Sequence, residues 1–175
     1  MKKNNGVKSD NASMPSNEWK ESIDSCKMRL KNGEKPEDVF DYCGDFSEGF
    51  AVVVLNDKYN FINTDGKIIS KQWFDYCGNF FEGFTRIELN NKWNFINTDG
   101  KLVSKEWFNG CYNFYNGFAG VNLNNKCNFI NTDGNILSEQ WFDYCYDFSE
   151  GFANVNLNNK YNFINTDGKI LSKQW

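Results

Sequence analysis

The chain has 175 residues, a net charge of −4 and an apolar share of 40%, and 18% of its residues are aromatic. This acidic balance lacks the basic stripe that neutralises phosphate groups, so we expect no nucleic-acid partner. No apolar run reaches about 18 residues, so the sequence predicts no membrane span. The polar N-terminus has no apolar segment typical of a secretory signal, which favours a cytoplasmic location.

The first 39 residues form a leader that holds one aromatic residue, Trp19. Residues 1–15 are polar, and we expect them to be disordered. Residues 16–39 are predicted to form an amphipathic helix followed by a linker, in which 35–38 break the helix. The apolar stripe of this helix consists of Trp19, Ile23, Cys26 and Leu30. The helix either covers the exposed end of the segment that follows or binds a partner.

A ten-residue phrase, KYNFINTDGK, begins at Lys58 and returns with small changes at an interval of 34 residues. Cutting the chain at Phe40 gives four copies of this period, at 40–73, 74–107, 108–141 and 142–175. A fixed period of this length is typical of a repeat architecture, in which each unit packs on its neighbours. One unit alone buries too little apolar surface to fold.

Each copy contains turn signals that separate short strands. In the first copy, Asn56-Asp57 lies between two apolar runs and predicts a tight hairpin, because both residues tolerate the left-handed backbone of primed turns. The phrase Asn63-Thr64-Asp65-Gly66 predicts a turn that is closed by a left-handed glycine and capped by Asp65. Residues 67–70 then suggest a third strand. We therefore predict an all-β protein of four antiparallel three-stranded meanders, arranged as a propeller or as an open stack.

Pairing the strands through the two-residue turn places apolar side chains on both faces of each sheet. One face carries Ala51, Val53 and Ile62, and the other carries Phe50 and Phe61 with their neighbours. A sheet with two apolar faces must be covered on both sides. Neighbouring copies are the expected cover.

The six cysteines are not spaced as metal ligands are, and the chain has no histidine. We expect free thiols that behave as small apolar groups, with a disulfide or a metal site as the alternatives. No cofactor, metal or catalytic residue is predicted, because each candidate side chain recurs in several copies and histidine, the usual general base, is missing. A calcium loop at the repeated aspartates fails because an EF-hand needs an acidic residue where Phe61 stands.

Residues 59–69, together with the Ser-Glu-Gly-Phe-Ala phrase at 47–51, resemble the WG-repeat proteins of bacteria and phages. Asparagine, as at Asn60, replaces the glycine of that family's motif in every copy, and only Trp93 keeps the tryptophan. Since asparagine tolerates a left-handed backbone, we expect the fold to accept the change. The resemblance implies a propeller-like β array that serves as a binding or scaffold module, without catalytic residues.

If the chain binds a partner, the positions that vary within the constant frame are the candidates. They belong to three rows on one sheet face, where aromatic anchors stand beside variable neighbours. The candidate residues are Val52, Val54, Tyr59, Arg86, Glu88, Trp93, Asn122, Asn154, Asn156 and Tyr161. The alternative is that these rows lie between copies and differ only in packing.

These observations favour a non-catalytic scaffold for protein–protein interaction. The alternative is a carbohydrate-binding or cell-wall-binding array, because repeated aromatic rings can stack on sugars. The last copy reaches Trp175 without a polar cap. Its strands close a ring, or a partner or second chain covers them, or the sequence belongs to a longer protein. An uncovered edge favours self-association through the C-terminal repeat.

Overall fold

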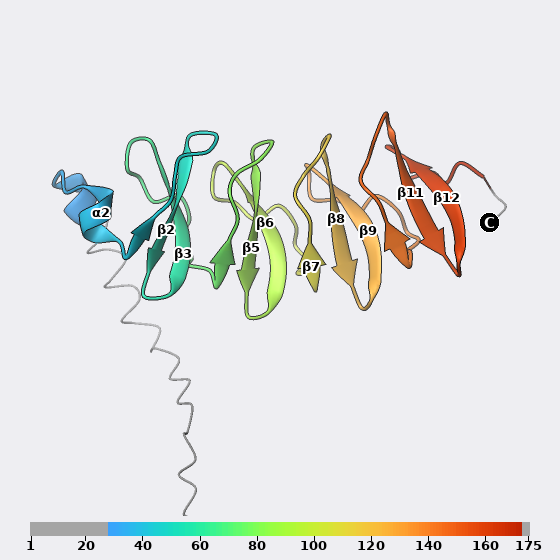
Figure 1. Cartoon of the computed structure of the whole chain (residues 1–175), viewed down its shortest axis with the longest axis horizontal. Coiled ribbons are helices and arrows are strands. Elements are labelled where there is room, and N and C mark those ends of the chain that lie inside the picture. The colour runs from blue at the N-terminus through green and yellow to red at the C-terminus, as the bar shows by residue number, and fades with distance from the viewer. Residues whose placement is uncertain (1–27, 173–175) are drawn as a thin grey trace, which may run out of the picture.

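The computed structural model describes residues 28–172, which form four antiparallel three-stranded sheets side by side in an open row (Figure 1). Each sheet comes from one 34-residue copy, called a unit below and numbered from one to four along the chain. The first and fourth units lie at opposite ends of the row, with helix α2 beside the first. The prediction of an all-β array of four meanders is confirmed, and its arrangement is the open stack.

The strands of each unit follow one plan, a short outer strand followed by a long hairpin. The outer strands are β1 (Tyr42–Cys43), β4 (Tyr76–Cys77), β7 (Gly110–Cys111) and β10 (Tyr144–Cys145). The central strands are β2 (Phe50–Leu55), β5 (Phe84–Leu89), β8 (Phe118–Leu123) and β11 (Phe152–Leu157). The last strands are β3 (Lys58–Asn63), β6 (Lys92–Asn97), β9 (Lys126–Asn131) and β12 (Lys160–Asn165).

The turns explain why these segments pair in one register. In the first hairpin, Asn56 and Asp57 have φ of 50° and 59°, which is the primed turn that the sequence predicts. Gly66 closes the second turn with φ of 73°, also as predicted. The cap of that turn is Asn63 instead of the expected Asp65. Its Oδ1 accepts hydrogen bonds from the amides of Asp65 and Lys67, at 3.1 and 2.8 Å.

The third strand of each unit is not the one that we predicted. Residues 67–70 make a single bridge, between Ile62 and Ile68, and the two-residue strand before the hairpin completes the sheet instead. The buried side chain of Asn60 takes over the pairing there: its Oδ1 accepts from Phe61 and Ser70 amides, and its Nδ2 donates to the Ser70 and Gln72 carbonyls. Hydrogen bonds of the Asn60 side chain thus replace the regular backbone pairing of a third strand here.

This bonding also corrects the expected role of the asparagines that stand in the glycine position. Asn60 and its counterparts lie within strands and are absent from the residues with positive φ. They are almost completely buried and bond through their amide groups. Hydrogen bonding, and not a left-handed backbone, is the reason that asparagine suits this position.

Neighbouring units share their cores at all three junctions, so the expected cover by neighbouring copies is confirmed there, whereas one face of the fourth sheet is open within 28–172. Val52 and Phe61 of the first unit pack with Phe74, Cys77 and Phe80 of the second unit, and the pattern recurs at the next two junctions. The backbone also crosses the junction, because Tyr59 and Phe74 exchange two hydrogen bonds of 2.9 and 3.0 Å. Each unit is completed by the next.

The leader covers part of the first unit. Residues 28–31 are helical, and helix α2 (Pro36–Val39) forms one turn in the segment that we expected to break the helix. Leu30 and Val39 pack against the core of the first unit. Residues 1–15 and most of the predicted helix, including Trp19, lie outside the described residues. Within 28–172 no helix has the length and apolar character needed to cross a membrane.

The cysteines depart from the sequence prediction at one junction. Cys127 and Cys145 form a disulfide between the third and fourth units, with their Cα atoms 6.0 Å apart. Cys43, Cys77 and Cys111 are free, as predicted. The bridge forms because Cys127 occupies the position where the other units carry Tyr or Trp, which places its sulfur against the recurring cysteine of the next unit. Cys26 lies outside the described part of the chain.

Candidate interaction surface

Each unit turns one sheet face toward the following unit, here called the C-side, and the other toward the preceding unit, the N-side. Direct pairing of Tyr42 with Val54, and of Val54 with Tyr59, places these three residues on the C-side. Val52 and Phe61 share that face. All ten candidate residues therefore lie on the C-side of their units.

The candidates nearest the core lie between units. Val52 is buried against the second unit. Arg86, its counterpart in the second unit, lies with its guanidinium 5.7 Å from the ring centre of Trp93 and donates a hydrogen bond of 3.1 Å to the Cys111 carbonyl in the third unit. These side chains join one unit to the next.

The candidates farther from the core form a half-exposed rim. Tyr76 lies between Tyr59 and Trp93, with ring-centre distances of 5.8 and 5.6 Å, so that aromatic contact continues across the junction of the first two units. Val54 and Glu88 are paired with these rings, Asn122 is paired with Gly110 and Cys127, and all three side chains are half-buried. We call the rim the aromatic strip; it consists of Tyr42, Tyr59, Tyr76, Trp93, Tyr144 and Tyr161. The strip is interrupted in the third unit, where Gly110 and Cys127 replace the rings.

The three candidates of the fourth unit have no following unit among the described residues. Tyr161 is exposed and Asn154 is half-buried, whereas Asn156 is buried. The Oδ1 atoms of both asparagines are buried without a hydrogen-bond partner within 28–172. The structure thus places the same three rows in different surroundings, between units at the first three positions and at an open face at the fourth.

Ion pairs link adjacent units at two of the three junctions. The Lys58 ammonium pairs with the Asp75 carboxylate of the next unit, and Lys126 pairs in the same way with Asp143. Partial burial by itself would raise the pKa of Asp75. Hydrogen bonds from Lys58 and the Asn90 amide, together with the Lys58 charge, outweigh burial and lower this pKa. At Asp143, hydrogen bonds from Lys126 and the Asn158 amide lower the carboxyl pKa.

A hollow of about 290 Å³ opens at the junction of the third and fourth units. It exists because Gly120 stands where the other units carry Val, Arg or Asn, and because the aromatic strip is interrupted beside it. Its wall is formed by Tyr112, Tyr144, Tyr146, Asn122, Asp143 and Asp147. Rings beside carboxylate and amide groups are suited to contact a polar ligand.

A further row of contacts was not identified as such from the sequence. The Glu48 carboxylate accepts hydrogen bonds of 2.9 and 2.8 Å from the amides of Glu82 and Gly83 in the next unit. Glu82 binds the amides of the third unit in the same way. The sequence shows the recurring Ser-Glu-Gly phrase. It does not show that the carboxylate binds amides about 34 residues away, because that contact depends on how the units stack.

The fold defines a class of protein: a linear array of β units that share their cores. A family model described as "WG containing repeat" matches residues 39–59, 61–93, 95–127 and 129–161, more than half of the chain. The chain therefore belongs to the WG-repeat family, as its resemblance indicated. A comparison with curated protein sequences gave no match.

Solved structures resemble the chain only distantly. KlHsv2 with loop 6CD replaced by a Gly-Ser linker has a TM-score of 0.47 at 9% identity, over 73% of this chain and 50% of that one. Kluyveromyces lactis Hsv2p has a TM-score of 0.39 at 12% identity, over 74% and 49%. A protein of unknown function from Bacteroides caccae has a TM-score of 0.30 at 12% identity, over 74% and 58%. The chain spans about half the length of the Hsv2 chains that it matches.

Proposed function

We propose that this chain is a non-catalytic scaffold that binds a protein partner along the aromatic strip. The supporting observation is the half-exposed run Tyr59, Tyr76 and Trp93, which crosses a unit boundary beside side chains that differ between units. Aromatic side chains dominate binding energy at protein interfaces. The constant frame holds the rings in place, and the variable neighbours, such as Val54 and Glu88, select the partner.

A non-catalytic role is supported by the chemistry of the side chains. The chain contains no histidine, so the usual general base is missing. Burial raises the pKa of the Cys77 and Cys111 thiols, which keeps them protonated and poorly nucleophilic. The acidic balance disfavours a nucleic-acid partner. We propose a protein as the partner for these reasons.

The test compares an immobilised wild-type chain with the double variant Tyr76→Ala, Glu88→Ala in capture of proteins from a cell extract. Loss of one aromatic anchor worth about 2 kcal/mol weakens binding roughly 30-fold. The matched control is Tyr115→Ala, an exposed tyrosine outside the strip. Thermal melting checks that all three chains are folded. Equal capture by the wild type and the double variant would contradict the proposal.

Carbohydrate binding is a second candidate, favoured by the hollow between the third and fourth units. Its tyrosines could stack on a sugar ring, while Asn122 and Asp147 hydrogen-bond the hydroxyl groups. A glycan array separates the two functions. Binding that is lost in Tyr146→Ala and kept in Tyr76→Ala would assign the hollow as a sugar site.

A further inference from the structure

We propose that copies of this chain bind head to tail, with the C-side of the fourth unit of one copy against the N-side of the first unit of the next. This contact uses the two ends of the row and does not require that the aromatic strip binds another protein. The chain itself contains the template: an aromatic insertion and a close glycine approach recur at all three junctions inside the row, and a carboxylate contact recurs at the first two. At the two ends of the row, each of these contacts is represented by one of its two halves: one at the fourth unit and the other at the first.

The first contact is an aromatic insertion. Phe80 packs between Phe50 and Phe61 of the preceding unit, with ring-centre distances of 4.5 and 5.0 Å. Phe114 and Phe148 repeat this insertion at the next two junctions, with distances between 4.4 and 4.9 Å. All three inserted rings are buried. The insertion is therefore a constant part of a junction between units.

At the ends of the row this insertion is divided into its two halves. Phe152 and Phe163, the counterparts of Phe50 and Phe61, are 42% and 45% exposed, and no ring packs between them among the described residues. Phe46, the counterpart of Phe80, is 53% exposed. Docking Phe46 of one copy between Phe152 and Phe163 of another would bury all three. The equivalents of Phe46 and Phe163 in the other units are buried, and contiguous exposed apolar patches mark interaction surfaces.

The second contact carries charge and sets the direction. At the first two junctions a glutamate carboxylate binds the two turn amides of the following unit, as Glu48 does with Glu82 and Gly83. In the part of the chain that the structure describes, Glu150 has no such amides to bind, and the amides of Glu48 and Gly49 have no carboxylate. A concave pair of backbone amides attracts an anion. Head-to-tail docking would place the Glu150 carboxylate of one copy against the Glu48 and Gly49 amides of the next.

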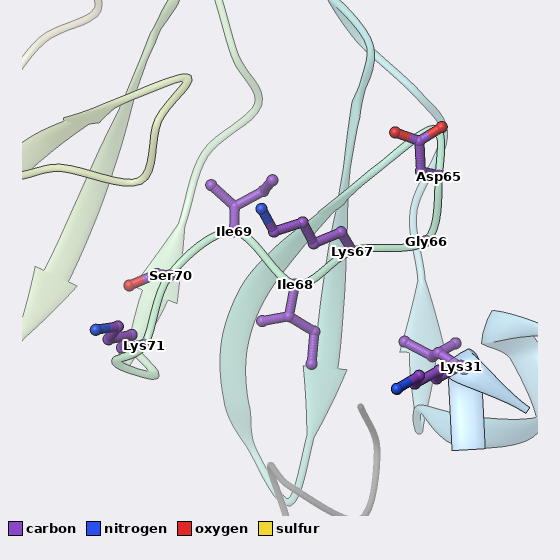
Figure 2. Close-up of a pocket in the computed structure, with 9 residues that line it drawn as sticks. Lys31, Asp65, Gly66, Lys67, Ile68, Ile69, Ser70 and Lys71 are labelled. Carbon is purple, nitrogen blue, oxygen red and sulfur yellow. The ribbon is translucent and has the colours of Figure 1, made fainter. Parts of the chain in front are cut away.

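The third contact is a close approach of backbones. A Cβ built on Gly100 would lie 2.5 Å from the Ile69 carbonyl oxygen of the preceding unit, and Gly134 and Gly168 are closer still to their counterparts. A Cβ built on Gly66 would have no atom of the described residues within 4 Å beyond its own chain neighbours, and a hollow of about 540 Å³ lies there. Figure 2 shows this hollow between the leader residue Lys31 and the loop that carries Asp65 and Gly66.

The chain also holds a segment that matches this hollow. Leu171 is the counterpart of Ile69 in the fourth unit, and it is 66% exposed. In the internal junctions this position lies directly against the glycine turn of the next unit. Placed in the hollow of a second copy, Leu171 would meet Gly66 as Ile69 meets Gly100.

The leader competes with the second copy for the N-side of the first unit. Leu30 and Val39 cover the region around Phe40 and Ile62, where the internal junctions place a side chain such as Phe61 from the preceding unit. Docking of a second copy must displace these two side chains. Self-association is therefore expected to depend on concentration and to strengthen when the leader packs less well. Head-to-tail contacts that do not close into a ring extend into filaments.

The test uses the full chain and measures its molar mass in solution across a range of concentrations. The wild type is expected to form dimers and longer species as its concentration rises. Phe46→Asp blocks one end and Phe163→Asp blocks the other, so each variant alone is expected to remain monomeric. A mixture of the two is expected to form a one-to-one dimer and nothing larger, because each chain keeps one intact end. Phe81→Asp, an equally exposed ring away from the end faces, should associate like the wild type.

Every outcome bears on the proposal. A wild type that stays monomeric throughout, or a mixture of blocked variants that does not pair, overturns it. Dimers of Phe46→Asp by itself would show a symmetric contact between two C-sides and also overturn it. Leu30→Asp, which loosens the leader, is expected to associate at lower concentration; weaker or unchanged association would contradict the competition with the leader. Thermal melting confirms that each variant is folded.

Discussion

At the scale of single residues, the buried asparagine of each unit replaces a regular strand pairing. Asn94 is fully buried, donates to the carbonyls of Ser104 and Glu106, and accepts from the amides of Phe95 and Ser104. Both the donor and the acceptor ends of one amide group are therefore used. An aspartate cannot donate these bonds, and a glycine cannot make any of them.

Replacing Asn94 by alanine is expected to lower the free energy of unfolding by about 2–4 kcal/mol, because several buried backbone groups lose their partner. Urea denaturation measures the change. Asn113 is exposed, and Asn113→Ala should change the stability by less than about 0.5 kcal/mol. An Asn94→Ala chain as stable as the control would show that water or the backbone satisfies these groups.

The sequence alone suggested the wrong role for this asparagine. Position 60 aligns with a glycine of the family motif, and both Asn and Gly tolerate a left-handed backbone. The residues that have positive φ lie elsewhere, at the Asn56-Asp57 turn and at Glu48. A local preference for a backbone conformation carries no information about distant bonds, such as those from Asn60 to residues 70 and 72.

At the scale of elements, the glycine turns serve two purposes. Each closes a loop with positive φ, and the last three also bring the backbone against the preceding unit. The first turn, at Gly66, has a similar φ, but within 28–172 no other unit lies against it. Gly66 and the later turn glycines share the strain of a left-handed backbone. Only the later glycines also contact the preceding unit, so comparing them separates the two effects.

Gly134→Ala is therefore expected to destabilise the chain more than Gly66→Ala. The Gly66 variant pays only for a left-handed alanine, about 1–2 kcal/mol. A Cβ at Gly134 would lie 1.9 Å from the Val103 carbonyl oxygen, so the two units must move apart. We expect a further loss of about 1–3 kcal/mol in the free energy of unfolding, as for other overpacked sites. Equal losses in the two variants would mean that the junction yields without strain.

At the scale of the whole molecule, shared cores, charge pairs and a disulfide hold the row together. The disulfide between Cys127 and Cys145 joins the fourth unit to the third. Disulfides persist in oxidising compartments, whereas the cytoplasm keeps thiols reduced. The cytoplasmic location stays a prediction that bears directly on whether this link forms in the cell.

Removing the disulfide is expected to cost about 3 kcal/mol, the value for a closed loop of this size. Cys145→Ser should unfold at lower denaturant concentration than the wild type, and added reductant should lower the wild type to about the same level. The variant itself should not respond to reductant. Cys111 is a free thiol, so Cys111→Ser serves as the control that keeps the response. A wild type whose stability ignores reductant would contradict a stabilising disulfide.

The sequence by itself determined the period, the β class, the two kinds of turn and the need for neighbours. These follow from patterns a few residues long: residues such as Asn56 and Gly66 favour particular backbone angles, and apolar side chains on both strand faces require cover. The identity of the outer strand, the bonding of Asn60, the bridge from Cys127 to Cys145 and the open row depended on the tertiary structure. Each of these joins residues that are distant along the chain, and their approach depends on how one unit packs on the next.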